Sequence, residues 1–163
     1  MKQHPRHLDE YKKQLKKGHV QKAYKQILDF LSSFRLHLEK NHTHLSLSNS
    51  VQNYYLEVSY FFILTEKLKK EKLKIVLFFY HESFTFDVWL SGNNKAVRKK
   101  FVEKIPAKTL KKFTSKISED DVFSIVRHTL VSDADFKDSD ALNITLEKGL
   151  LKFTADVENI LPI

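Results

Sequence analysis

The sequence predicts an α+β fold in which a small antiparallel sheet of about three strands, at 54–64, 73–81 and 84–91, packs against N-terminal and C-terminal helices. The first observation is the run from Leu73 to Leu90, where two strongly apolar segments flank a short polar turn. The second is that apolar residues recur every three or four positions in two long segments, 19–40 and 140–161, which is typical of amphipathic helices. Strands and helices in separate parts of a chain favour α+β.

The predicted hairpin has two different faces, because successive strand side chains point to opposite sides of a sheet. We pair His81 with Phe84 across a turn at Glu82 and Ser83. One face is then wholly apolar and carries Leu73, Ile75, Leu77, Phe79, Phe84, Phe86, Val88 and Leu90. The other face is aromatic and polar and carries Lys74, Val76, Phe78, Tyr80, Thr85, Asp87, Trp89 and Ser91. We expect any ligand of the hairpin to bind this second face, although a one-residue slip would exchange the two.

The segment 54–64 is apolar on both alternating sides, as in a strand that is covered on both faces. Glu57 is the exception. Because an unpaired buried carboxylate is costly, Glu57 must reach water, pair with a cation or serve a site.

The remaining helices are predicted at 7–17, 94–105 and 119–131, with a further short helical turn at 107–113. Gly18 ends the first, since glycine readily takes the left-handed conformation that follows a helix. Asn93 and Asn94 are candidate caps of the second, and the acids 119–121 lie at the positive end of the dipole of the third. A chain of 163 residues supports one core, so we expect a single domain over 1–163.

Composition excludes several classes of site. The chain has no cysteine, which removes disulfides, thiolate metal sites and cysteine nucleophiles. We see neither a secretory hydrophobic segment near the first residue nor an apolar run long enough to span a membrane, so the expected location is the cytoplasm.

The charge is basic and unevenly placed. Residues 1–113 hold 23 Lys and Arg against 10 Asp and Glu, whereas residues 114–163 hold 5 against 10. This pattern fits a solvated lysine-rich surface, an anionic partner, or two segments that attract each other. The strongest candidate for an anion-binding element is the helix 94–105, with Lys95, Arg98, Lys99 and Lys100.

No metal site or cofactor is expected. His42 and His44 are close in sequence but lie in a polar loop without a third ligand nearby. The acidic run 133–140 lacks the glycine and terminal glutamate of a calcium loop, and helix-capping acids explain it better.

Three blocks of the chain resemble an uncharacterised bacterial family, domain of unknown function 7000: YKKQLKKGHVQKAYKQIL, KLKIVLFFYHESFTFDVWLSGNN and SDADFKDSDALNITLEKGLLKFTADVEN. The resemblance extends over nearly the whole chain. It implies one α+β domain of bacterial, cytoplasmic origin and no established activity. Family members often carry an aspartate at the position of Glu57 and a Tyr-Trp pair where this chain has Lys100 and Phe101, which weakens any aromatic pocket reaching beyond Trp89.

The sequence is compatible with three functions, and it does not show whether the protein is an enzyme. The first is a non-catalytic module that binds a small ligand, peptide or nucleotide through Glu57, Tyr80, Asp87, Trp89, Asn93 and Arg98. The second is nucleic-acid binding through Lys95, Arg98, Lys99 and Lys100. The third is a metal-dependent hydrolase or nuclease built on Glu57 and Asp87, if the strand order brings these two together. The oligomeric state stays open.

Overall fold

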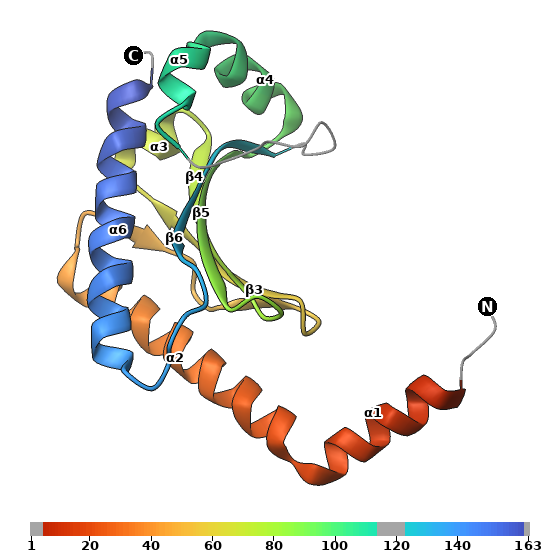
Figure 1. The fold of residues 1–163 in the computed structure, drawn as a ribbon. Coiled ribbons are helices and arrows are strands. Elements are labelled where there is room, and N and C mark those ends of the chain that lie inside the picture. Colours follow the sequence, from red (N-terminus) through yellow and green to blue (C-terminus); the bar gives the residue numbers. More distant parts are fainter. Residues whose placement is uncertain (1–4, 114–122, 162–163) are drawn as a thin grey trace.

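The computed structural model describes residues 5–113 and 123–161. Helices α2 (His19–Asn41) and α6 (Ser139–Ile160) lie along one side of a strongly curved sheet (Figure 1). The other helices are α1 (Pro5–Lys17), α3 (Glu66–Lys70), α4 (Lys95–Lys104) and α5 (Ala107–Leu110). The strands are β1 (Ser46–Leu47), β2 (Gln52–Tyr54), β3 (Val58–Leu64), β4 (Leu73–Tyr80), β5 (Thr85–Gly92) and β6 (Ser124–Val131).

All the strand pairs of the sheet are antiparallel, in the order β1-β3-β4-β5-β6. The short β2 also pairs with β3, so β1 and β2 together line one edge of that strand. The register of the β4–β5 hairpin is the predicted one, with Phe79 opposite Phe86 and Tyr80 opposite Thr85. The two predicted faces of the hairpin are therefore confirmed.

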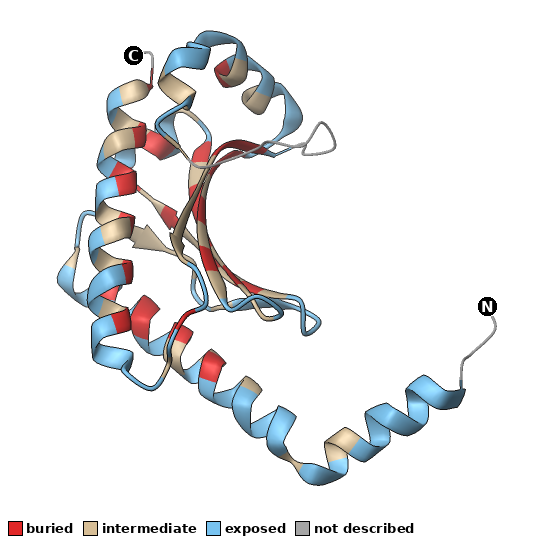
Figure 2. Cartoon of the chain, viewed as in Figure 1, coloured by how far each residue is buried: buried red, intermediate tan, exposed pale blue. Residues whose placement is uncertain are grey.

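One face of the sheet forms the core against α2 and α6 (Figure 2). The rings of Phe61, Phe79 and Phe86 are completely buried there. From α2, Phe34 lies 6.4 Å from Phe61 between ring centroids. The stripe that α6 turns to the sheet is Leu142, Leu146, Leu150, Phe153 and Val157. The predicted packing of helices against the sheet is thus observed for the N-terminal α2 and the C-terminal α6, but not for α1, which buries no residue.

The opposite, concave face of the sheet carries no helix of the described chain, as Figure 1 shows. Alternate residues of β3, β4 and β5 on this face are mostly half-buried, whereas their neighbours on the helix side are fully buried. This difference follows the two-residue period of the strand, since every second side chain has a layer of helices above it and its neighbours do not.

The sheet is larger than the predicted three strands, and β6 is the main addition. The predicted helix 119–131 is wrong over Ser124–Val131, which is a strand paired with β5, while residues 119–122 lie outside the described chain. The misleading helical spacing of Ile125, Val126 and Leu130 has a physical cause. The β5–β6 register shifts near both ends of β6, and each shift breaks the simple alternation of a strand.

The predicted strand 54–64 is also wrong at its beginning. Residues Tyr55–Glu57 form a turn between β2 and β3, and Tyr55 has φ of 50°. The turn contains no Gly, Asn or Pro, so the sequence lacks the usual turn signal there.

The helices at the two ends match the predicted ranges closely. Gly18 separates α1 from α2 with φ of 75°, in the left-handed region expected of it. Helix α1 buries none of its residues and projects away from the sheet (Figures 1 and 2). Among the described helices, none combines the length and the apolar character needed to cross a membrane.

Candidate ligand-binding site

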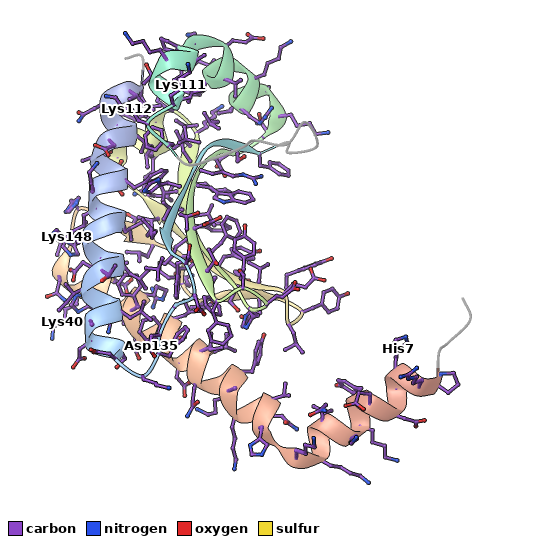
Figure 3. All side chains as sticks on the ribbon, in the orientation of Figure 1. His7, Lys40, Lys111, Lys112, Asp135 and Lys148 are labelled. Carbon is purple, nitrogen blue, oxygen red and sulfur yellow. The ribbon has the colours of Figure 1, made fainter. Side chains whose placement is uncertain are left out.

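The concave face carries a continuous row of aromatic rings from three neighbouring strands. Tyr60 lies 5.7 Å from Phe62 along β3 and 5.4 Å from Phe78 on β4, between ring centroids. Phe78 in turn lies 4.3 Å from Trp89 on β5 and 6.1 Å from Tyr80. These separations are those at which aromatic pairs attract one another. Figure 3 shows side chains projecting from the sheet into the concave side of the molecule.

A hollow of about 340 Å³ lies over this row. Its volume is at the small end of the range for pockets that hold small molecules. Its lining comes from Tyr54, Val58, Tyr60, Phe62, Lys74, Val76, Phe78, Trp89, Ser91, Asn93 and Phe123. The lining is mostly apolar and aromatic with a few polar groups, which is the composition that orients a ligand as well as burying it.

Among the described residues of this lining, Lys74 alone carries a formal charge at neutral pH. Its Nζ lies 4.3 Å from the centroid of the Phe62 ring, a cation–π geometry. Burial lowers the pKa of Lys74 from its ordinary value, because the ammonium loses part of its hydration.

Trp89 is enclosed on both sides of its indole. Phe78 packs against it, and the Cζ of Arg127 on β6 lies 3.8 Å from the centroid of the Trp89 ring. Its Nε1 is buried, and no hydrogen-bond acceptor among the described residues reaches it. A buried donor without an acceptor loses the hydrogen bond that it makes to water in the unfolded chain.

Asp87 lies farther along the same face, opposite Phe78 and Thr129 in the two flanking strands. Thr129 Oγ1 donates a hydrogen bond of 2.8 Å to its Oδ1. Burial raises the pKa of Asp87, although that hydrogen bond and the nearby Arg127 act in the opposite direction. Burial, reinforced by the charge of Asp87, also raises the pKa of Tyr80 to about 12.

The structure brings together four of the six predicted ligand-binding residues. Tyr80, Asp87 and Trp89 share the concave face, and Asn93 lines the hollow at the end of β5. Arg98 has another role: its Nε donates a hydrogen bond of 2.8 Å to the backbone oxygen of Ser124, which fastens α4 to β6.

Glu57 does not belong to this group. It is exposed in the turn before β3, where its backbone oxygen accepts a hydrogen bond from the amide of His81 at the far end of the hairpin. Asp87 is two strands away and about three residues farther along the sheet, which corresponds to a separation of roughly 10 Å in each direction. The pair that a metal-dependent hydrolase would need is not formed, and the described residues contain no cluster of three metal-binding side chains.

Two lysines of the basic helix α4 lie close to carboxylates of the same chain. Lys100 Nζ lies 3.4 Å from Glu71, and Lys99 Nζ lies 3.9 Å from Glu103. Lys95 is exposed at the first position of the helix. The side-chain oxygen of Asn94 caps the helix by accepting a hydrogen bond of 2.9 Å from the backbone amide of Val97. The predicted helix cap is therefore formed by Asn94.

His42 and His44 do not form a metal site with a third residue. His42 Nε2 lies 2.5 Å from Glu147 on α6, and His37 Nε2 lies 3.0 Å from the other oxygen of the same carboxylate. This contact ties the end of α2 to α6 on the helix side of the molecule. His42 thus has a structural partner that its local sequence could not reveal.

Sequence reasoning placed Lys74 on the same side of the hairpin as Phe78, which the register confirms, but it missed Tyr60, Phe62 and Arg127 as components of the concave face. The alternation of β3 contained the signal for Tyr60 and Phe62, because they lie opposite Phe78 and Val76 on the same face. Arg127 had no such signal, since its segment was interpreted as a helix.

A second hollow, of about 520 Å³, lies between α2, α6 and the segment around Phe136. It is larger than the hollow on the concave face, and its lining mixes apolar residues, including Phe30, Phe84 and Phe136, with polar residues of two helices, including Gln26 and Asp29. We regard the concave face as the better site, because its aromatic rings and its charge converge on one surface.

Comparison with known proteins gives the family alone. No curated protein matches the chain, and neither does any solved structure. The family model described as "Domain of unknown function (DUF7000)" matches residues 4–161, which is nearly the whole chain. The protein therefore belongs to this family of unknown function.

Proposed function

We propose that this protein is a non-catalytic binding module whose concave sheet face holds a small ligand with a flat apolar body. The observation that carries the proposal is the row of half-buried aromatic rings beneath a hollow of ligand size. Helices α2 and α6 cover the other face, and no helix of the described chain lies over this row.

The aromatic row favours binding on energetic grounds. Large rings lose about 25 cal/mol of transfer free energy for each Å² that stays in water, so a contiguous aromatic surface is unfavourable unless something covers it. A flat ligand stacked on Tyr60 and Phe78 would remove that surface from water. Aromatic rings already fixed by neighbours in a sheet lose little conformational entropy when a ligand arrives.

The polar groups of this face support a binding role better than a catalytic one. One oxygen of Asp87 already accepts the hydroxyl of Thr129, and Glu57 lies on another part of the surface. A general acid–base pair requires two groups within reach of one substrate atom.

Nucleic acid is the second candidate ligand. The observation in its favour is that α4, with exposed Lys95 and Lys99, begins two residues after Asn93, which lines the aromatic hollow. Aromatic platforms beside basic segments bind single-stranded bases in a strongly salt-dependent way. Binding of labelled single-stranded RNA or DNA should then fall steeply between about 50 mM and about 200 mM salt, and a flat response would exclude this candidate.

The proposed function can be tested on the single tryptophan of the chain, because its indole N–H gives one NMR signal from inside the site. We expect two-ring aromatic compounds to shift this signal at millimolar concentration or below. Tyr60→Leu should weaken their binding roughly three- to tenfold, since an aromatic contact adds about 0.5–1.5 kcal/mol.

Tyr11→Leu is the matched control, because Tyr11 is an exposed tyrosine on α1, away from the hollow. Its affinity should equal that of the unaltered protein. If no aromatic compound moves the indole signal, or if Tyr60→Leu and Tyr11→Leu behave alike, the concave face is not the binding site.

A further inference from the structure

Two residues that line the hollow on the concave face, Lys74 and Trp89, carry donors that lack an acceptor among the described residues. Among the described residues, no carboxylate or other acceptor lies within hydrogen-bonding distance of Lys74 Nζ, which makes a cation–π contact with the Phe62 ring. Trp89 Nε1 is buried and equally without an acceptor. Both groups belong to the lining of the same hollow.

The strand register places these two donors close together. Lys74 is opposite Ser91, and Trp89 is opposite Val76, so the two residues are diagonal neighbours on adjacent strands. Diagonal neighbours on one face have β-carbons about 7–8 Å apart, within the span that one ligand can bridge. Phe78, on the same face of β4, packs against the Trp89 ring and extends the aromatic surface beside the donors.

The positive charge of Lys74 in the hollow favours a ligand with a negative charge. Among the described residues, the lining contains Lys74 and no Asp or Glu, while Asp87 lies outside it and accepts the hydroxyl of Thr129. A half-buried ammonium that finds no counter-ion among the described residues is unfavourable, which agrees with the lowered pKa of Lys74. An anion in the hollow would restore the lost interaction.

We propose that the ligand of the concave face is a small aromatic carboxylate, whose rings stack on the aromatic row while its carboxylate oxygens accept from Lys74 Nζ and Trp89 Nε1. This inference rests on the proposed function, since it names the ligand of the same site. The two donors match the two oxygens of one carboxylate. A phosphate group presents three strong acceptors and typically recruits arginine forks or several backbone amides.

The experiment compares three compounds with the same rings: biphenyl-4-carboxylate, the neutral biphenyl-4-carboxamide and biphenyl-4-yl phosphate. Each is titrated by calorimetry, and the Trp89 indole N–H signal is followed by NMR. We expect the carboxylate to bind at least about tenfold more tightly than the carboxamide, because hydrogen bonds to charged groups are stronger than neutral ones. It should also shift the indole proton downfield as Nε1 gains an acceptor.

Lys74→Met tests the cation and keeps an apolar stem over Phe62. This variant should bind carboxylate and carboxamide with equal affinity, whereas Lys74→Arg should retain the preference for the carboxylate. Lys148→Met is the control, because Lys148 is an exposed lysine on α6, on the helix side of the molecule (Figure 3). It should leave the preference unchanged.

The outcomes separate the two proposals. If none of the three compounds binds, the proposed function fails and this inference fails with it. If the carboxamide binds as well as the carboxylate, or if Lys74→Met weakens both equally, the site is an aromatic binding face but not a carboxylate site. Tighter binding of the phosphate compound would likewise overturn the carboxylate assignment while leaving the binding face intact.

Discussion

Phe78 and Phe79 are consecutive residues of β4 with opposite surroundings. Phe79 is completely buried, and its ring is within 6 Å of the rings of Phe84, Phe86 and Phe136. Phe78 is half-buried on the concave face beside Tyr60 and Trp89. Both faces of the sheet are rich in aromatic residues, but helices cover one of them. The comparison shows that the aromatic content of a strand does not by itself distinguish core from binding surface.

The two faces also treat polar groups differently. The helix-side face of β4 and β5 contains only apolar residues before Gly92, whereas the concave face includes Lys74, Asp87 and Ser91. In a fully buried face these groups would be unfavourable, since each costs free energy when it is removed from water. Their presence distinguishes the concave face from the hydrophobic core on the other side of the sheet.

The largest expected effect comes from truncating the two phenylalanines in turn. Phe79→Ala should reduce the free energy of unfolding by about 3–5 kcal/mol, because it leaves a cavity in a packed core. Phe78→Ala should cost about 1–2 kcal/mol, since part of its ring is already in water. Urea unfolding of both variants measures the difference. Equal losses would mean that the concave face is covered in solution.

A smaller effect is expected from Glu147, a carboxylate on the helix side. The hydrogen bond from His42, with a second from His37, lowers the pKa of Glu147 despite some desolvation. A lowered pKa in the folded state contributes stability above the ordinary value of 4.5, and that contribution is lost as the pH falls through the folded value.

Glu147→Gln should therefore destabilise the protein by about 1 kcal/mol near pH 6 and by progressively less as the pH falls below 4.5. Thermal unfolding across this pH range gives the measurement. A difference between the two proteins that stays constant with pH would show that the carboxylate charge is not involved.

The smallest effect, of opposite sign, is expected from Asp87 on the concave face. Its pKa is raised, because burial outweighs the favourable contacts of the carboxylate. The folded protein thus holds this proton more tightly than the unfolded chain, and ionisation above the folded pKa costs stability. That cost disappears once the pH falls below the ordinary value of 3.8.

Asp87→Asn should accordingly leave stability unchanged or raise it by up to about 1 kcal/mol at neutral pH, with the difference shrinking on acidification. Thr129 keeps an acceptor in this variant. A loss of more than about 1 kcal/mol at neutral pH would instead indicate that the charge of Asp87 stabilises the fold through its neighbours.

Local periodicity in the sequence was sufficient to predict the helices at both ends, the β4–β5 hairpin and its register. It failed where the chain departs from a regular period. In β6, the content of Ile125, Val126 and Thr129 favours a strand, but the register shifts produce a helix-like spacing. Before β3, the turn at Tyr55–Glu57 lacks turn-forming residues, so the strand was predicted to start too early.

The candidate site was predictable only in part, because it depends on which strands are neighbours. Tyr80, Asp87 and Trp89 follow from the alternation of one hairpin. The contribution of Arg127 depends on the pairing of β5 with a segment some 40 residues away in the chain, and no local pattern contains that information. The separation of Glu57 from Asp87 was undecided for the same reason.

The ways in which the sheet ends at β1, β2 and β6 have a consequence for the behaviour of the protein at high concentration. A straight, unpaired strand at the edge of a sheet is a template for strands of other molecules, and neighbouring aromatic residues would strengthen such an assembly. Here the outer edge of β3 is shared by two short strands, and the last strand in the order, β6, is irregular near both ends. Short edge strands and bulges resist the addition of further strands. The protein can therefore keep an aromatic sheet face free of covering helices in its described chain without that sheet extending into fibres.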